Sequence, residues 1–148
     1  ELNPSSLSID FLNEWFFKTM HHEFAHILHQ TKNYSTDFNL ISTDYQGPSW
    51  LNLESDAAAN AMGYVTRYAS YSPDEDFVEI ISNYVTHAKG YWESVMANAG
   101  EEGGEKLTKK FEIIRNYLQE SWGIDIDKLR DIVQKRSGNL SQLDLTTL

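Results

Sequence analysis

The segment DFLNEWFFKTMHHEFAHILHQ, residues 10–30, carries an apolar repeat that decides its local structure. Its large apolar residues recur at intervals of three and four positions, which is the period of an α-helix. Ser8 or Asp10 is suited to cap the start of such a helix. The repeat consists of Leu12, Phe16, Met20, Phe24, Ile27 and Leu28. The pattern therefore predicts a first helix from about residue 10 to residue 30.

Two histidines lie four residues apart in this predicted helix, in the order His22-Glu23-x-x-His26. Residues at this spacing share one helix face, so both imidazoles can reach a single zinc ion at about 2 Å. Glu23 lies about 100° round the helix, where a carboxylate can accept a proton from water beside a metal without binding the metal. The spacing indicates a zinc site, provided that a third protein ligand exists.

Glutamates further along the chain offer that third ligand. The metzincin pattern needs Gly at position 29 and His at position 32, and the chain has His29 and Lys32 there. A glutamate from a separate helix is the alternative. Glu75 and Glu79 share one face of a predicted helix. One carboxylate can bind the metal while the other holds a ligand histidine by its free N–H.

The rest of the chain also has helical patterns, separated by turn-forming residues. Residues 31–52 read as irregular, with a short extended piece at Phe38–Ile41. Gly100–Gly104 reads as a break, and Gly138–Leu148 as a loose tail. Further helices are expected at about 54–62, 73–98, 105–121 and 127–136. Pro73 and the acids after it suit the start of the second of these, Gly123 ends the third, and Asp125 or Asp127 caps the last.

Composition limits the possible functions. A chain of 148 residues with 41% apolar residues is long enough for one folded domain. The net charge of −10 argues against nucleic acid as a partner, and the absence of cysteine excludes disulfides and thiolate metal ligands. No run approaches the ~20 apolar residues of a membrane span. Because the sequence opens on Glu1, we expect a single domain, residues 1–148, taken from the C-terminal part of a longer protein.

Three segments together resemble a known family. HHEFAHILHQ, GYVTRYASYSPDEDFVE and the intervening PSW resemble the substrate import-associated zinc metallohydrolases, which are lipoproteins of Bacteroidetes encoded alongside outer-membrane nutrient importers. The resemblance covers about residues 10–98. It implies a mainly α, zincin-like fold of the gluzincin type, with a helical catalytic core of about five helices. It also implies a cell-envelope location, lipid-anchored at the outer membrane or periplasmic, with a nutrient-import complex as partner.

A more distant similarity, to the metalloprotease domain of anthrax lethal factor, suggests individual roles. That domain has a tyrosine and then an E-F-F-A-E run after its own HExxH. The similarity implies that Glu75 is the third zinc ligand, that Glu79 supports a ligand histidine, and that Tyr68 stabilises the oxyanion. With the register shifted, Glu79 is the ligand and Glu75 its neighbour. Tyr64 and Tyr71 stay alternatives to Tyr68.

The sequence thus predicts a zinc metallopeptidase in which Glu23 is the general base and a peptide or protein is the substrate. Zincins usually bind substrate along a sheet that precedes the metal helix, and only about ten residues precede it here, so we expect most of that sheet to be missing. The alternative is a non-catalytic, zinc-containing component of a nutrient-uptake system, which His29 as a fourth ligand would favour. Otherwise His29 contacts substrate or packs among polar groups. A plain helical interaction domain without metal is the third possibility.

Overall fold

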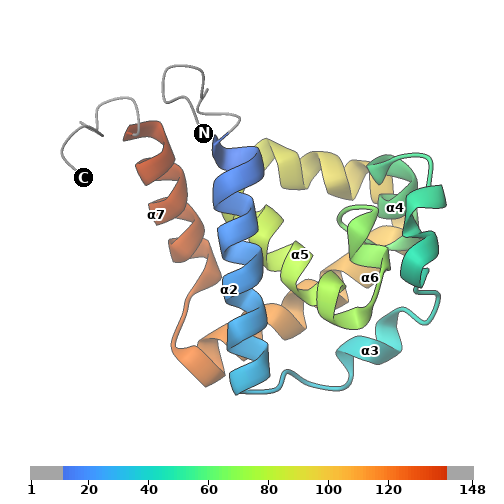
Figure 1. Cartoon of the computed structure of the whole chain (residues 1–148), viewed down its shortest axis with the longest axis horizontal. Coiled ribbons are helices and arrows are strands. Elements are labelled where there is room, and N and C mark those ends of the chain that lie inside the picture. Colours follow the sequence, from blue (N-terminus) through green and yellow to red (C-terminus); the bar gives the residue numbers. More distant parts are fainter. Residues whose placement is uncertain (1–11, 140–148) are drawn as a thin grey trace.

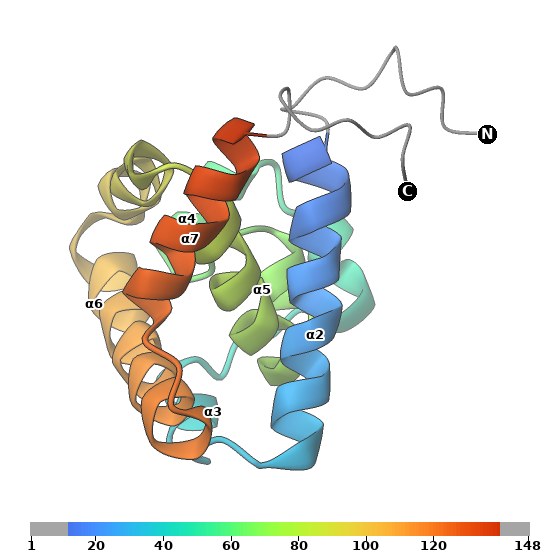
Figure 2. The same cartoon turned by 90° about the vertical axis from the view of Figure 1, so that its left-hand side faces the viewer.

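The computed structural model describes residues 12–139, and for residues 12–14 only the backbone. The caps predicted at Ser8 and Asp10, and most of the predicted tail, lie outside this range. The described part is helical, with no β-strand between residues 12 and 139, so the prediction of a mainly α fold is confirmed (Figures 1 and 2). The elements are η2 (Leu12–Phe17, a π-helix), α2 (Lys18–Thr31), α3 (Phe38–Ile41), η3 (Gly47–Asn52, 3-10), α4 (Asp56–Met62), η4 (Tyr68–Ser70, 3-10), α5 (Pro73–Thr86), α6 (Lys89–Trp122) and α7 (Ile126–Asn139).

Helix α5 lies at the centre of the fold, between α2 and α6 (Figure 2). Every residue of α5 from Asp76 to Thr86 is buried, and the helix packs against α2, α6, α7 and η4. Its start is fixed locally, because the Ser72 hydroxyl accepts a hydrogen bond from the backbone N–H of Glu75 and Pro73 occupies the first turn. The capped N-terminus of the most buried helix therefore sets the position of Glu75.

Two glycines end helices, and an aspartate caps the start of another, largely as the sequence predicts. Gly63, with φ of 92°, ends α4, and Gly123, with φ of 66°, ends α6. The Asp125 carboxylate accepts hydrogen bonds from the backbone N–H groups of residues 127 and 128, so Asp125 caps α7. Helix α7 continues to Asn139 and thus includes the first two residues of the predicted tail.

Three local predictions are wrong. The helix expected to run from 73 to 98 stops at Thr86, and the chain is extended at His87 and Ala88 before α6 begins. Phe38–Ile41 is a helical turn, with a buried Phe38, and not an extended piece. The predicted break is confined to Gly100, where φ is 63° and α6 kinks, whereas Gly103 and Gly104 are helical and buried.

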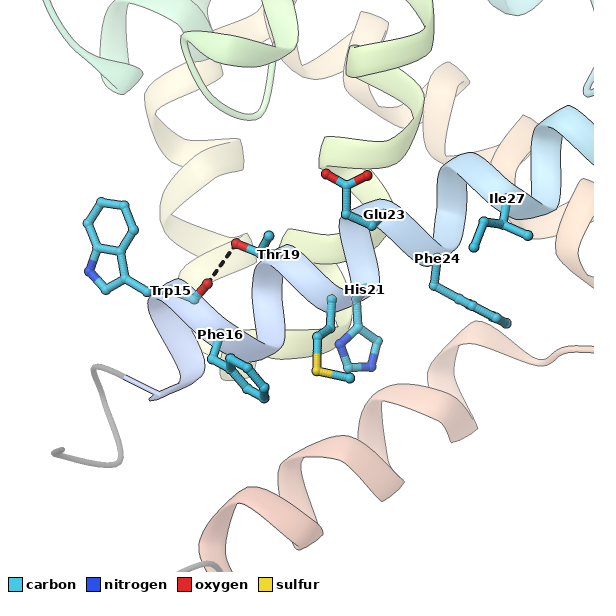
Figure 3. Close-up of a pocket in the computed structure, with 8 residues that line it drawn as sticks. Trp15, Phe16, Thr19, His21, Glu23, Phe24 and Ile27 are labelled. Carbon is cyan, nitrogen blue, oxygen red and sulfur yellow. Dashed lines mark hydrogen bonds between the residues drawn. The ribbon is translucent and has the colours of Figure 1, made fainter. Parts of the chain in front are cut away.

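The apolar repeat of the first helix does predict a helix, but most of its side chains are exposed. Among the repeat residues whose side chains are described, only Leu28 is buried, at 7% exposure, because the histidine face of α2 is the one that packs against α5. Phe16, Met20, Phe24 and Ile27 are 50–58% exposed. Together with Trp15 they line an open hollow of about 530 Å³. Figure 3 shows Phe16 and Phe24 on the side that faces α7, and Trp15 pointing away from it. We call these five residues the apolar face of α2, although Trp15 and Phe16 belong to η2, which leads directly into α2.

Candidate metal centre

The two motif histidines point from α2 toward the start of α5. Nε2 of His22 lies 3.2 Å from Oε2 of Glu75, and Nε2 of His26 lies 3.5 Å from the same oxygen. One ligand atom from each of the three residues lies within 4.8 Å of the others. Among the side chains that the structure describes, from residue 15 to residue 139, this is the single group of histidines and acids that meets such a spacing. Two helices far apart in sequence thus bring two nitrogens and one oxygen to a common point.

The geometry of these atoms fits a tetrahedral zinc ion. Ligands about 2.0–2.1 Å from zinc at tetrahedral angles are about 3.3 Å from each other, close to the two distances from Glu75. Oε2 of Glu75 is buried and makes no hydrogen bond, which would be costly for a carboxylate oxygen without a cation. Two imidazoles and one carboxylate are also a donor set that zinc uses in catalytic sites. The residues present therefore fit the ion.

Glu79 lies on the other side of His22 from Glu75. Its Oε1 accepts a hydrogen bond from Nδ1 of His22 at 2.9 Å, and its Oε2 accepts one from Thr66 at 2.7 Å and pairs with Lys18 at 3.2 Å. Burial raises the pKa of Glu79, but the His22 hydrogen bond, Lys18 and Thr66 outweigh it and lower the pKa to about 2. Of the two registers left open by the sequence, the structure brings Glu75, and not Glu79, to both Nε2 atoms.

His29 is buried beside the group but is not part of it. Its Nε2 lies 2.9 Å from Nδ1 of His26, on the edge of that ring opposite the nitrogen that faces Glu75. Burial lowers the pKa of His29, and the neighbouring His26 lowers it further. The described residues therefore bring three protein groups to the metal point, and His29 is not a fourth.

Glu23 and Tyr68 border a hollow beside His22. This hollow has a volume of about 330 Å³ and is also lined by Trp15, Lys18, Thr19 and Glu79. Glu23 is exposed, and Figure 3 shows its carboxylate pointing away from Phe16 and Phe24. The ring of Tyr68 lies 6.1 Å from that of His22, and burial followed by the Glu75 carboxylate raises the pKa of Tyr68 to about 12. Both groups thus line the same hollow as His22, one of the three residues of the metal point.

The two alternative tyrosines are placed differently. Tyr64 is fully buried, and its hydroxyl donates to Asp44 at 2.8 Å. Tyr71 is exposed and its ring packs against that of Tyr68, with ring centroids 6.0 Å apart. Neither lines the hollow, so Tyr68 is the one of these three tyrosines that borders it.

Comparison with known proteins gives the family. The model of a family described as "Putative zinc-binding metallo-peptidase" matches residues 1–127, which is most of the chain. The chain belongs to this family.

A solved structure is similar over nearly the whole chain. The crystal structure of a "putative zinc-binding metallo-peptidase" from Bacteroides caccae matches with a TM-score of 0.88 and 40% sequence identity, over 97% of this chain and 54% of that chain. The chain thus spans about half the length of the chain that it matches. Among curated proteins, none is significantly similar.

The site also contains residues that the sequence did not single out. Lys18 precedes His22 by four positions, so helix spacing could have placed it on the same face. Thr66 and Asn83 complete the surroundings of Glu79, since the Asn83 side chain donates to Oε2 at 3.2 Å. Thr66 lies in the segment between α4 and η4, and no local pattern connects it with α2.

Proposed function

We propose that this chain carries the zinc site of a metallopeptidase of the gluzincin type, in which His22, His26 and Glu75 hold the ion. The observation that carries the proposal is the convergence of their three ligand atoms, with Oε2 of Glu75 buried and without a hydrogen bond. Three protein ligands leave a fourth tetrahedral position for water or substrate, as in catalytic rather than structural zinc sites.

When bound, zinc supplies positive charge that lowers the pKa of a neighbouring water toward neutrality and stabilises negative charge on a carbonyl oxygen. Glu23 accepts the proton of the attacking water and passes it to the leaving amine. Tyr68, whose raised pKa keeps its hydroxyl protonated, donates a hydrogen bond to the oxyanion. Glu79 holds the Nδ1–H of His22 and so leaves Nε2 free to bind the ion.

We propose further that the chain is the helical, metal-binding part of a longer protein, with a single domain here and additional polypeptide elsewhere. The solved relative has almost as much chain again outside the matched region. The apolar face of α2 is a surface that such polypeptide would bury, since its five large apolar side chains line one hollow.

A cell-envelope location and a nutrient-import partner are part of the same proposal and follow from the sequence resemblance. Among residues 12–139, no helix combines the length and the apolar character that a membrane crossing requires.

Replacement of the general base tests the function. In the full-length protein we expect Glu23→Gln to keep stoichiometric zinc and to lose hydrolysis of a mixed peptide library, because the amide cannot accept the proton. Glu112→Gln, at an exposed position of α6, is the matched control and should behave as wild type. Unchanged turnover in Glu23→Gln would exclude Glu23 as the base. Stoichiometric zinc without any cleavage by the wild type would instead support the non-catalytic, zinc-containing binding component.

A further inference from the structure

His29 is a buried polar side chain that the proposed reaction does not use. It lies one turn after His26 on the inner face of α2, with 7% of its surface exposed. Its neighbours are mainly aromatic, with ring centroids 5.7 Å from Tyr34 and 6.1 Å from Phe77. A buried imidazole in such surroundings needs a hydrogen-bond partner to offset its desolvation. The partner that the structure gives it is Nδ1 of His26, at 2.9 Å.

The position of His26 decides how the protons in this pair are arranged. Nε2 of His26 faces Glu75 at 3.5 Å and is the nitrogen directed to the metal point. That nitrogen can bind a cation only without a proton, so the proton of a neutral His26 is on Nδ1. Nδ1–H of His26 then donates, and Nε2 of His29 must be the acceptor. A hydrogen bond between these two nitrogens, with Nε2 of His26 free to bind the ion, requires two neutral histidines that each carry the proton on Nδ1.

The two metal-facing histidines are therefore supported by different chemistry. His22 donates to a carboxylate, Glu79, which is itself paired with Lys18. His26 donates to a neutral imidazole. A ligand histidine in most zinc sites is held by a carboxylate, a backbone carbonyl or water, and loss of that partner weakens metal binding about 10–100-fold. The same requirement applies to His26, whose acceptor here is a side chain and can be replaced.

We infer that His29 is a positioning residue for His26: its Nε2 accepts the Nδ1–H of His26, fixes the tautomer and ring orientation of that histidine, and thereby strengthens metal binding. The inference rests on the proposed zinc site, because it assigns His26 to the ion. It differs from a fourth-ligand role, since Nε2 of His29 is directed at the far edge of the His26 ring and not at the metal point.

Zinc affinity and the tautomers of the histidines test this role without any activity assay. We expect His29→Phe, which keeps the ring but not the acceptor, to weaken zinc binding about 10–100-fold in a competition titration with a chromophoric chelator. His29→Gln, whose side-chain oxygen can accept the same hydrogen bond, should recover most of that loss. His21→Phe is the matched control on α2 and should leave the affinity at the wild-type value, because the ring of His21 contacts the backbone oxygen of Phe17 and not the site.

A ¹H–¹⁵N correlation spectrum of the histidine rings in the wild-type protein gives an independent result. Zinc-loaded protein should show Nδ1 protonated in both His26 and His29, with His29 unbound to metal. Equal zinc affinities for His29→Phe and wild type would overturn the inference. A proton on Nε2 of His29 in the wild-type spectrum would overturn it as well, and this result does not depend on whether His29→Phe folds. Failure of the wild type to bind zinc would reject the proposed function itself, whereas normal zinc binding with an indifferent position 29 would reject this inference alone.

Discussion

The carboxylate of Asp76 and the ammonium group of Lys110 form an ion pair of 2.6 Å in which both side chains are fully buried. Asp76 follows Glu75 on α5, and Lys110 reaches it from α6, where its Nζ also donates to the backbone oxygen of Gly63. Burial raises the pKa of Asp76 to about 6 and lowers that of Lys110, and each charge offsets part of the cost for the other. The pair thus fixes the residue next to the proposed zinc ligand.

Removal of the cation alone should destabilise the fold strongly. Lys110→Met leaves the Asp76 carboxylate buried without its partner, and we expect a loss of about 3–5 kcal/mol in the free energy of unfolding, measured in urea. The double variant Asp76→Asn/Lys110→Met removes both charges and should recover a large part of that loss. Equal destabilisation of the single and the double variant would show that the pairing is not the cause.

The glutamates of α5 should differ in their effect on zinc binding. Glu75→Gln replaces the oxygen that faces both histidines, and we expect it to abolish zinc binding at micromolar zinc. Glu79→Gln leaves the ligand set intact but weakens the support of His22, so its loss should be about 10–100-fold. Chelator competition measures both. The opposite ranking would mean that Glu79 is the ligand and would restore the other register.

The hydroxyl of Tyr68 should matter for turnover and not for metal binding. Tyr68→Phe removes the proposed oxyanion donor, and we expect kcat to fall about 10²–10³-fold while zinc affinity stays at the wild-type value. Tyr71→Phe is the control, because its ring packs against Tyr68 outside the hollow. A larger loss in Tyr71→Phe than in Tyr68→Phe would exchange their roles.

Sequence periodicity predicted the helices well because three- and four-residue spacings and capping residues are local properties. It did not predict which face of α2 is buried. The apolar repeat that includes Phe24 and Ile27 is exposed, whereas the histidine face is covered by α5. Nor did it predict the end of α5, since neither His87 nor Ala88 is a residue that normally breaks a helix.

The candidate site was predictable only in part, because spacing along one helix does not show how two helices pack against each other. The spacing of His22 and His26 shows from sequence that they share a face, but the choice between Glu75 and Glu79 depends on how α5 is rotated against α2. The structure supplies that rotation through the Ser72 cap and the buried Asp76. The contact between His26 and His29 also depends on side-chain orientation, which spacing alone leaves open.

Two adjacent glycines of α6 provide a test of the packing between α4 and α6. A Cβ added at Gly103 would lie 2.4 Å from the backbone oxygen of Asn60, whereas one at Gly104 would meet only the Met96 side chain at 3.6 Å. We expect Gly103→Ala to lower the free energy of unfolding by about 1–3 kcal/mol, because the two helices must separate. Gly104→Ala should raise it by about 0.5–1 kcal/mol through helix propensity. Similar effects at both positions would contradict the close approach of α4 and α6.

The exposure of the apolar face of α2 should differ between this chain alone and the longer protein that we propose. Phe24 is 55% exposed and Leu28, one turn later, is 7% exposed. In this chain, Phe24→Ala should therefore change the free energy of unfolding by less than about 0.5 kcal/mol. Leu28→Ala should cost about 2–5 kcal/mol and is the matched control.

In the longer protein, we expect Phe24→Ala to cost about 3–5 kcal/mol, because additional polypeptide would bury the ring. If Phe24→Ala has the same small effect in both proteins, the additional polypeptide does not cover this face, and the exposed residues must serve another purpose.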